Sequence, residues 1–216
     1  MKKPIGKLAA VAGATAAVCA LTAASAPAAP STVWTVSPSP AGFSATNSAN
    51  AVLLIEIVKG NGIGITCSRT AFSGTLRSAT GDPAAVGTVG AVTLGSSGAA
   101  CTSALGPVTF APSPPWTFVA EDHTASTGVT EGHLADVDLR GTVGACVFRV
   151  RGRLPLTYTN ATGRLTLSAA TGDLTVVSQT NCGDAAPVGV SLVVRADHLV
   201  RTTGTALPPA IVGTGP

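Results

Sequence analysis

The sequence predicts an all-β fold with an antiparallel sandwich or barrel-like arrangement of strands. Val, Thr, Ile and Leu alternate with small residues along most of the chain, a pattern typical of strands. Gly, Pro, Asn and Asp interrupt this pattern at intervals of about ten residues, which is the spacing of turns in all-β proteins. After the first thirty residues, no Ala-rich stretch keeps the 3.6-residue periodicity of a helix.

The strands follow from runs of alternating apolar residues that are bounded by turn residues. In chain order, they are expected at residues 51–59, 63–69, 88–94, 132–140, 145–153, 163–168, 173–179 and 188–195.

Two of these segments predict a hairpin around the turn 141–144. If Arg140 pairs with Ala145, Asp136 lies opposite Arg149, with Asp138 on the diagonal. Each such cross-strand charge pair contributes roughly 0.2–1 kcal/mol, so we expect a ladder of charges on the outer face.

The beginning of the chain predicts a cleaved signal peptide over residues 1–26. Three lysines within the first seven residues precede an apolar stretch over 8–24, and a small-x-small pattern ends at Ala26. A second such pattern ends at Ala28, so cleavage after either residue is possible. We therefore expect a secreted, extracellular protein with no membrane attachment after cleavage.

The charge balance argues against two classes of partner. The formal net charge is +3, and the three lysines of the signal segment account for all of it. The remaining basic and acidic side chains are equal in number, so the sequence predicts no nucleic-acid partner and no polybasic membrane anchor. Aromatic residues make up only 4% of the chain, which predicts a core built from small side chains.

The cysteines predict two structural disulfides. With Cys19 removed in the signal peptide, four remain, and an even number in an exported protein indicates disulfide bonds. Neither a Cys-x-x-Cys pair nor a zinc-type Cys/His spacing is present, so no metal and no cofactor are expected. The four cysteines are Cys67, Cys101, Cys146 and Cys182.

An internal repeat selects one of the three possible pairings. The Trp-Thr pair at Trp34 recurs at Trp116, and the cysteines recur at the same offset of about 80 residues. We interpret the chain as two homologous halves, 31–111 and 112–205, followed by a flexible tail over 206–216. A repeat places one disulfide in each half, Cys67–Cys101 and Cys146–Cys182. The halves could be separate domains, but halves this small favour a shared core.

One stretch is rich in acidic residues and histidines and is a candidate polar site. Histidines with carboxylates serve in metal binding and in acid–base catalysis. The simpler interpretation, which we favour, is a polar loop that leads into the outer face of a strand. The candidate residues are Glu121, Asp122, His123, His133 and Asp136.

Three alternating arginines, Arg149, Arg151 and Arg153, form a second candidate, an anion-binding stripe. Such a stripe suits an anionic polymer, for example wall phosphates or sulfated glycans, but it also suits a solvated face that pairs with aspartates. His198 is expected on the surface or at a strand end.

The aromatic residues Trp34, Trp116 and Tyr158 are better explained as core anchors than as a sugar-binding platform. No nucleophile elbow, zinc-protease motif, phosphate-binding loop or dinucleotide fingerprint is present in the sequence. Catalytic residues are therefore not assigned.

Several short motifs resemble an uncharacterised family of small secreted β proteins of high-GC Gram-positive bacteria. This resemblance implies a secreted β protein and supplies no reaction. The matching segments are Pro115-Trp116-Thr117, 132–137, Cys146 with Gly152, Tyr158-Thr159-Asn160, Leu174-Thr175-Val176 and Cys182-Gly183-Asp184.

Together these features predict a non-enzymatic extracellular or envelope-associated module with a binding or structural role. A cell-wall polymer or another extracellular protein is the expected kind of partner. A secreted hydrolase of extracellular polymers is one alternative. An extracellular protease inhibitor that presents the loop 107–116 is another.

Overall fold

The computed structural model describes residues 31–58, 61–95 and 98–215, so the expected signal peptide lies outside the described residues. In the described chain, 69% of the residues are β-strand, and there is one short 3₁₀ helix. The strands are β1 (Val33–Ser37), β2 (Ala41–Asn47), β3 (Ala51–Val58), β4 (Asn61–Cys67), β5 (Thr70–Leu76), β6 (Ala79–Thr80), β7 (Ala84–Leu94), β8 (Cys101–Ser103), β9 (Gly106–Pro112), β10 (Trp116–Thr124), β11 (Val129–Val143), β12 (Cys146–Thr159), β13 (Arg164–Ala169), β14 (Leu174–Thr180), β15 (Ser191–Thr202) and β16 (Ala210–Thr214), and the helix is η1 (Gly183–Ala185).

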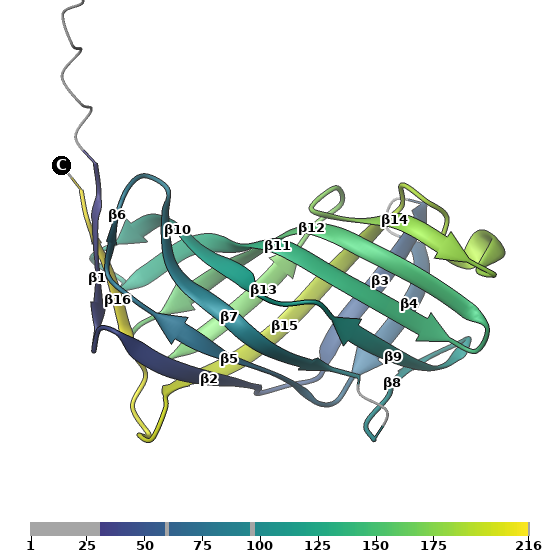
Figure 1. The fold of residues 1–216 in the computed structure, drawn as a ribbon, viewed down its shortest axis with the longest axis horizontal. Coiled ribbons are helices and arrows are strands. Elements are labelled where there is room, and N and C mark those ends of the chain that lie inside the picture. The colour runs from purple at the N-terminus through teal and green to yellow at the C-terminus, as the bar shows by residue number, and fades with distance from the viewer. Residues whose placement is uncertain (1–30, 59–60, 96–97, 216) are drawn as a thin grey trace, which may run out of the picture.

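Thirteen of these strands form one antiparallel sheet that closes on itself, which confirms the predicted all-β, barrel-like class. The sheet is an elongated tube in which two rings share strands (Figure 1). The ring nearer the described chain ends runs β11, β12, β13, β15, β2, β5, β7 and β10, and then returns to β11. The second ring runs β11, β12, β14, β15, β3, β4, β8 and β9, and also returns to β11.

Three long strands, β11, β12 and β15, hold the two rings together. Strand β11 pairs with β10 up to Ala135 and with β9 from Leu139 onward. Strand β12 pairs with β14 up to Gly152 and with β13 from Leu156. Each long strand therefore changes partner near its middle, and these changes define a seam across the tube.

A β-bulge in β11 marks the seam. The register between β11 and β12 shifts between Leu134 and Val137, and Asp136 within the bulge has a left-handed φ of 60°. Opposite the bulge, Gly152 has φ 149°, and a Cβ there would lie 2.0 Å from the carbonyl oxygen of Asp173. Only glycine allows this approach, so the bend is encoded by residues of both strands.

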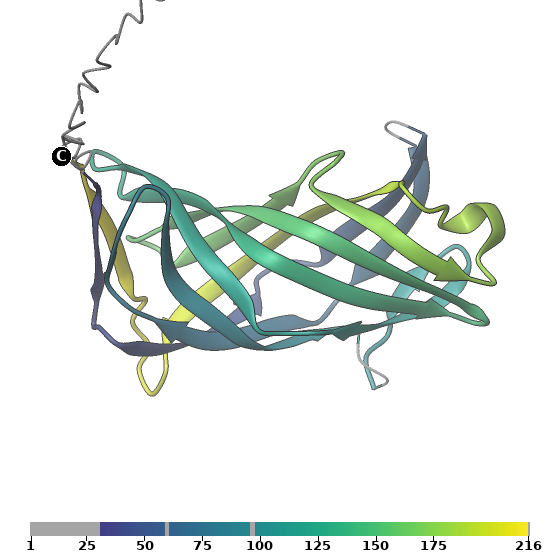
Figure 2. The same ribbon diagram turned by 45° about the horizontal axis from the view of Figure 1, so that its top comes forward.

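A second, three-stranded sheet of order β16-β1-β6 lies across the end of the tube where the described chain begins and ends (Figure 2). Trp34 on β1 is fully buried beneath it, and the indole Nε1 donates to the carbonyl of Gly81 at 3.0 Å. This cap therefore closes one end of the apolar interior.

The expectation of a flexible tail over 206–216 is wrong for residues 210–214, which form β16. Strand β16 pairs with β1 along its whole length. The side chain of Asn160 bonds both backbone groups of Ile211 at 2.8 Å, and Tyr158 donates its hydroxyl to the carbonyl of Pro209. The sequence gives only a weak signal for β16, because Asn160 and Tyr158 lie about fifty residues before the residues that they bond.

The interior contains the apolar side chains of both halves in one core. Both halves contribute strands to both rings, so they share a core rather than forming separate domains. The aromatic residues Trp34, Trp116 and Tyr158 are all buried, as expected for core anchors. Homology of the two halves stays a prediction. The described residues include no helix long and apolar enough to cross a bilayer.

Both predicted disulfides are present, one within each half. Cys67–Cys101 joins the end of β4 to β8, and Cys146–Cys182 joins the start of β12 to the segment before η1. Each closes a loop of about 35 residues, which in the chain-entropy model stabilises the fold by about 4 kcal/mol. These bonds supplement a core that has few large side chains.

We predict that Asn160→Ala destabilises the cap. The variant loses both hydrogen bonds to Ile211 and leaves two backbone groups partly unsatisfied, so the free energy of unfolding should fall by about 1–3 kcal/mol. Hydrogen exchange should also accelerate in residues 210–214, as measured by mass spectrometry. Asn50→Ala, in an exposed loop, is the control and should leave both quantities unchanged. Unaltered exchange in β16 of the Asn160 variant would contradict this role.

Candidate functional site

The β11–β12 hairpin places four arginines on the outer face of the tube. Val143 pairs with Cys146, so the turn consists of Gly144 and Ala145 alone. The predicted register is wrong, because Gly144 with φ 55° permits a two-residue turn and both strands continue further than expected. As a result, Arg140 lies directly opposite Arg149.

The same register places Asp138 opposite Arg151 and diagonal to Arg149. Asp138 accepts from Arg149 Nε at 2.7 Å and from Arg151 Nε at 2.9 Å. The hydrogen bond from Arg149 is the main cause that holds the pKa of Asp138 below its usual value. Further along β12, Arg153 Nε lies 3.4 Å from Asp173 Oδ1. Two carboxylates thus serve three of the arginines.

Arg140 is the fourth arginine of this face, and it has no carboxylate partner among the described residues. It borders a surface hollow of about 450 Å³ together with Arg149. Like charges directly opposite each other on a sheet repel. Here the two guanidinium groups, those of Arg140 and Arg149, border the same open hollow. We call the surface that carries Arg140, Arg149, Arg151 and Arg153 the arginine face. Its hollow is lined by Ser113, Arg140, Val147, Phe148, Arg149, Ser178, Gln179 and Thr180.

The acidic and histidine-rich candidate stretch lies on β10 and β11, and only one pair of its side chains meets. His133 Nδ1 lies 3.0 Å from Glu121 Oε1 across the two strands. His123 Nδ1 instead contacts Thr130 Oγ1 at 3.1 Å, and Asp122 accepts from the backbone N–H of His123.

Asp136, the fifth residue of that candidate, sits in the β11 bulge and contacts Thr117 Oγ1 at 3.5 Å. The imidazole of His133 makes no other hydrogen bond within the described chain, so the Glu121–His133 pair lacks a hydroxyl nucleophile. Across residues 31–58, 61–95 and 98–215, no three His, Cys, Asp or Glu side chains are placed to hold a metal ion. The arrangement is that of a hydrogen-bonded pair on the surface.

The segment 107–116 does not protrude from the molecule. Most of it belongs to β9, which pairs with β8 on one side and with β11 on the other. Trp116 at its end is buried, with the indole Nε1 donating to the carbonyl of Ser113 at 3.2 Å. The segment is therefore part of the wall, not an exposed inhibitory loop.

His198 is buried, contrary to the expectation of a surface or strand-end position. Its side chain points inward from β15 and is 2% exposed. Nε2 lies 2.7 Å from Thr70 Oγ1, and the ring packs on Phe72 with centroids 4.8 Å apart. Burial lowers the pKa of His198 to about 4, although the charge of Asp197 partly opposes this shift. Alternation along β15 was the signal that would have placed it inside.

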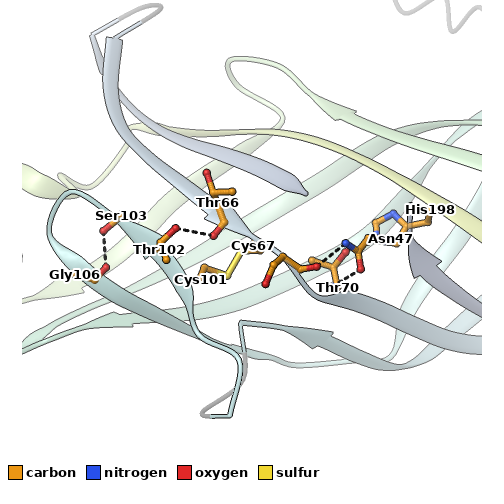
Figure 3. The surroundings of a disulfide bond; sticks show 10 residues. Asn47, Thr66, Cys67, Thr70, Cys101, Thr102, Ser103, Gly106 and His198 are labelled. Carbon is orange, nitrogen blue, oxygen red and sulfur yellow. Dashed lines mark hydrogen bonds between the residues drawn. A yellow bond between two sulfur atoms is a disulfide. The ribbon is translucent and has the colours of Figure 1, made fainter. Parts of the chain in front are cut away.

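Neighbouring contacts hold Thr70 in position (Figure 3). The backbone N–H of Thr70 donates to Asn47 Oδ1 at 3.0 Å, and the Asn47 amide donates to the carbonyl of Ser68 at 2.8 Å. The Cys67–Cys101 disulfide lies three residues before Thr70. The connection between β4 and β5 is thus fixed at the point where it meets His198.

We predict that stability falls as the pH is lowered from about 7 to 4. In this window the unfolded imidazole, with an ordinary pKa of 6.5, binds a proton that the folded protein excludes. The loss should reach about 3 kcal/mol and level off below pH 4 as far as His198 is concerned. Denaturant unfolding at successive pH values measures it.

His198→Phe should flatten that pH profile, because the variant retains a ring but cannot titrate. His133→Gln, which removes a histidine from the outer face, should keep the slope of the unmodified protein. Equal slopes in all three proteins would show that His198 does not control acid sensitivity.

Comparisons with known proteins found no match: no protein-family model, no curated protein and no solved structure matches this chain.

Proposed function

We propose that the protein is a secreted, non-enzymatic module that binds an anionic polymer outside the cell through the arginine face. The observation that carries this proposal is the guanidinium of Arg140, which lacks a carboxylate partner within the described part of the chain and borders a hollow beside Arg149. Phosphate, sulfate and carboxylate groups are the natural ligands of such a pair, because a guanidinium offers a fork of donors.

The charge balance of the face supports this proposal. Among the described residues, Asp138 and Asp173 pair with three of its four arginines, so the face keeps an excess of positive charge. The mature chain as a whole is expected to be neutral, so this excess is local. A local cationic site on a neutral protein favours binding of an anion at this face over nonspecific adhesion through net charge.

The other lining groups suit a polymer ligand. Ser178, Gln179 and Thr180 supply neutral donors and acceptors on one side of the hollow, and Ser113 lies in its lining as well. Such groups bind sugar or glycerol hydroxyls between the charged groups of a polymer. A hollow on a rigid sheet also costs little conformational entropy on binding, because the strands are already fixed by pairing.

The disulfides are compatible with an extracellular location, since such bonds persist in oxidising compartments. The expected signal peptide supports the same location. The hydrolase alternative has weaker support, because the Glu121–His133 pair has no nucleophile at hydrogen-bond distance among the described side chains. A bacterial wall phosphate polymer or a sulfated glycan is therefore the proposed class of partner.

The proposal predicts saturable, salt-sensitive binding of the purified, oxidised protein to polyanions. Isothermal titration with poly(glycerol phosphate), heparin and polygalacturonate should show at least one such complex, while neutral dextran should not bind. Arg140→Gln should weaken the complex about tenfold, the usual effect of one charge-assisted hydrogen bond.

Arg69→Gln is the matched control. Arg69 is exposed in the connection between β4 and β5, away from the arginine face, and the substitution changes the net charge equally. It should leave the affinity unchanged. Equal weakening by both substitutions would reduce the effect to net charge, and absence of binding to all three polyanions would refute the proposed function.

A further inference from the structure

A small cavity lies inside the tube, at the seam between the two rings. Its volume is about 60 Å³, and side chains of both rings line it. Nearly all of this lining is apolar, with Leu53, Leu134 and Leu174 among its largest members. Ala51 and Ala196 contribute only a methyl group each, so the space is consistent with the shortage of large side chains in the sequence.

His198 lines this cavity, and one of its two ring nitrogens is unpaired within the described chain. The Nδ1 atom of His198 has no hydrogen-bond partner among the described residues, although the side chain is 98% buried. Its other ring nitrogen is taken by Thr70 Oγ1. Leaving a buried nitrogen unpaired is unfavourable, so a ligand that supplies a partner gains both the new hydrogen bond and the relief of that penalty.

The wall is more open on the side of β7 than elsewhere. Strand β7 pairs with β10 only as far as Val89, and its next backbone bond on that edge joins Gly95 O to Phe110 N at 3.2 Å. Between these points the edge faces the Pro-rich 111–115 segment, in which the prolines have no N–H to donate. This stretch of wall is therefore not closed by backbone hydrogen bonds.

Exposure of the lining side chains agrees with that opening. Val92 and Leu94 face the core from this stretch of β7, yet both are only half-buried. The lining residues that come from strands other than β5 and β7 are all buried. The cavity thus has its accessible side beneath Val92 and Leu94.

We propose that this cavity is a binding site for a neutral aliphatic alcohol, with its hydroxyl on His198 Nδ1 and its alkyl chain directed toward Val92 and Leu94. A hydroxyl both donates and accepts, so it suits either tautomer of an imidazole whose Nε2 is paired with a threonine. No carboxylate or cationic side chain lines the cavity, so an ionic head group would be desolvated without a partner.

The size of the cavity sets the ligand geometry. A buried water needs about 10–15 Å³ of cavity volume measured in this way, so 60 Å³ accommodates the hydroxyl and about the first three carbons. The rest of a longer chain lies along the apolar opening. Affinity should therefore rise about fourfold for each added methylene that is buried there, and it should stop rising once the chain reaches solvent.

The test is a titration of the purified, oxidised protein labelled with ¹⁵N in its histidines. Ethanol, 1-butanol and 1-hexanol are compared with n-pentane, which has as many heavy atoms as 1-butanol but no hydroxyl. We expect the alcohols to move the His198 Nδ1 resonance saturably, in order of chain length. Pentane should bind about tenfold more weakly than 1-butanol and leave the Nδ1 resonance in place.

Two variants locate the site. Ala196→Leu fills the cavity and should abolish the alcohol response, whereas Ala85→Leu, on the exposed face of β7, should preserve it. His198→Phe should reduce 1-butanol binding to the level of pentane. If these variants do not fold, the alcohol and alkane series on the unmodified protein decides alone.

Three outcomes would overturn the proposal. The first is an Nδ1 resonance that no alcohol moves at concentrations that preserve the fold. The second is equal binding of 1-butanol and pentane. The third is a water-bonded Nδ1 that the alcohols fail to displace, which would mean that the cavity holds solvent only. None of these results depends on polyanion binding at the arginine face.

Discussion

Pairing along β11, β12 and β15 is the constraint on which the rest of the structure depends. Each of these strands supplies backbone partners to both rings, so the closure of either ring requires all three. Closure pairs the backbone N–H and C=O groups that edge strands would otherwise expose. This pairing matters in a chain whose side chains are too small to cover such edges. The bulge at Asp136 and the close approach at Gly152 lie where β11 and β12 change partners at the seam.

Closure also separates two kinds of chemistry. The inner face of the described chain is mainly apolar and includes the imidazole of His198, while the outer face of the β11–β12 hairpin carries the arginines. A one-residue change of register would exchange these faces, so the two-residue turn at Gly144 positions both. The arrangement of charges outside and the composition of the interior are thus consequences of the same pairing.

The sequence was sufficient for the fold class, the disulfides and the eight strands with regular alternation, because these features depend on local pattern and cysteine count. Eight strands escaped it: β1, β2, β5, β6, β8, β9, β10 and β16. Three of these, β2, β5 and β9, contain Gly, Ser or Pro residues that are typical of turns and become strand only through distant partners. The arginine stripe was predicted, but Arg140 was not. The position of Arg140 opposite Arg149 depends on the hairpin register, and the predicted register paired Arg140 with Ala145, four residues from its actual partner. The burial of His198 was missed although the alternation along β15 indicates it.

The pairing of β2 and β3 with β15 has a consequence for how the chain reaches its folded state. Strands β2 and β3 lie within residues 41–58, and on one side both pair with β15, which spans residues 191–202. Neither ring can close until the last long strand is available, so the native sheet forms after synthesis rather than during it. Such distant contacts are slow to form and leave strand edges exposed in the meantime. The polypeptide should accordingly stay incompletely folded until residues 191–202 have been synthesised.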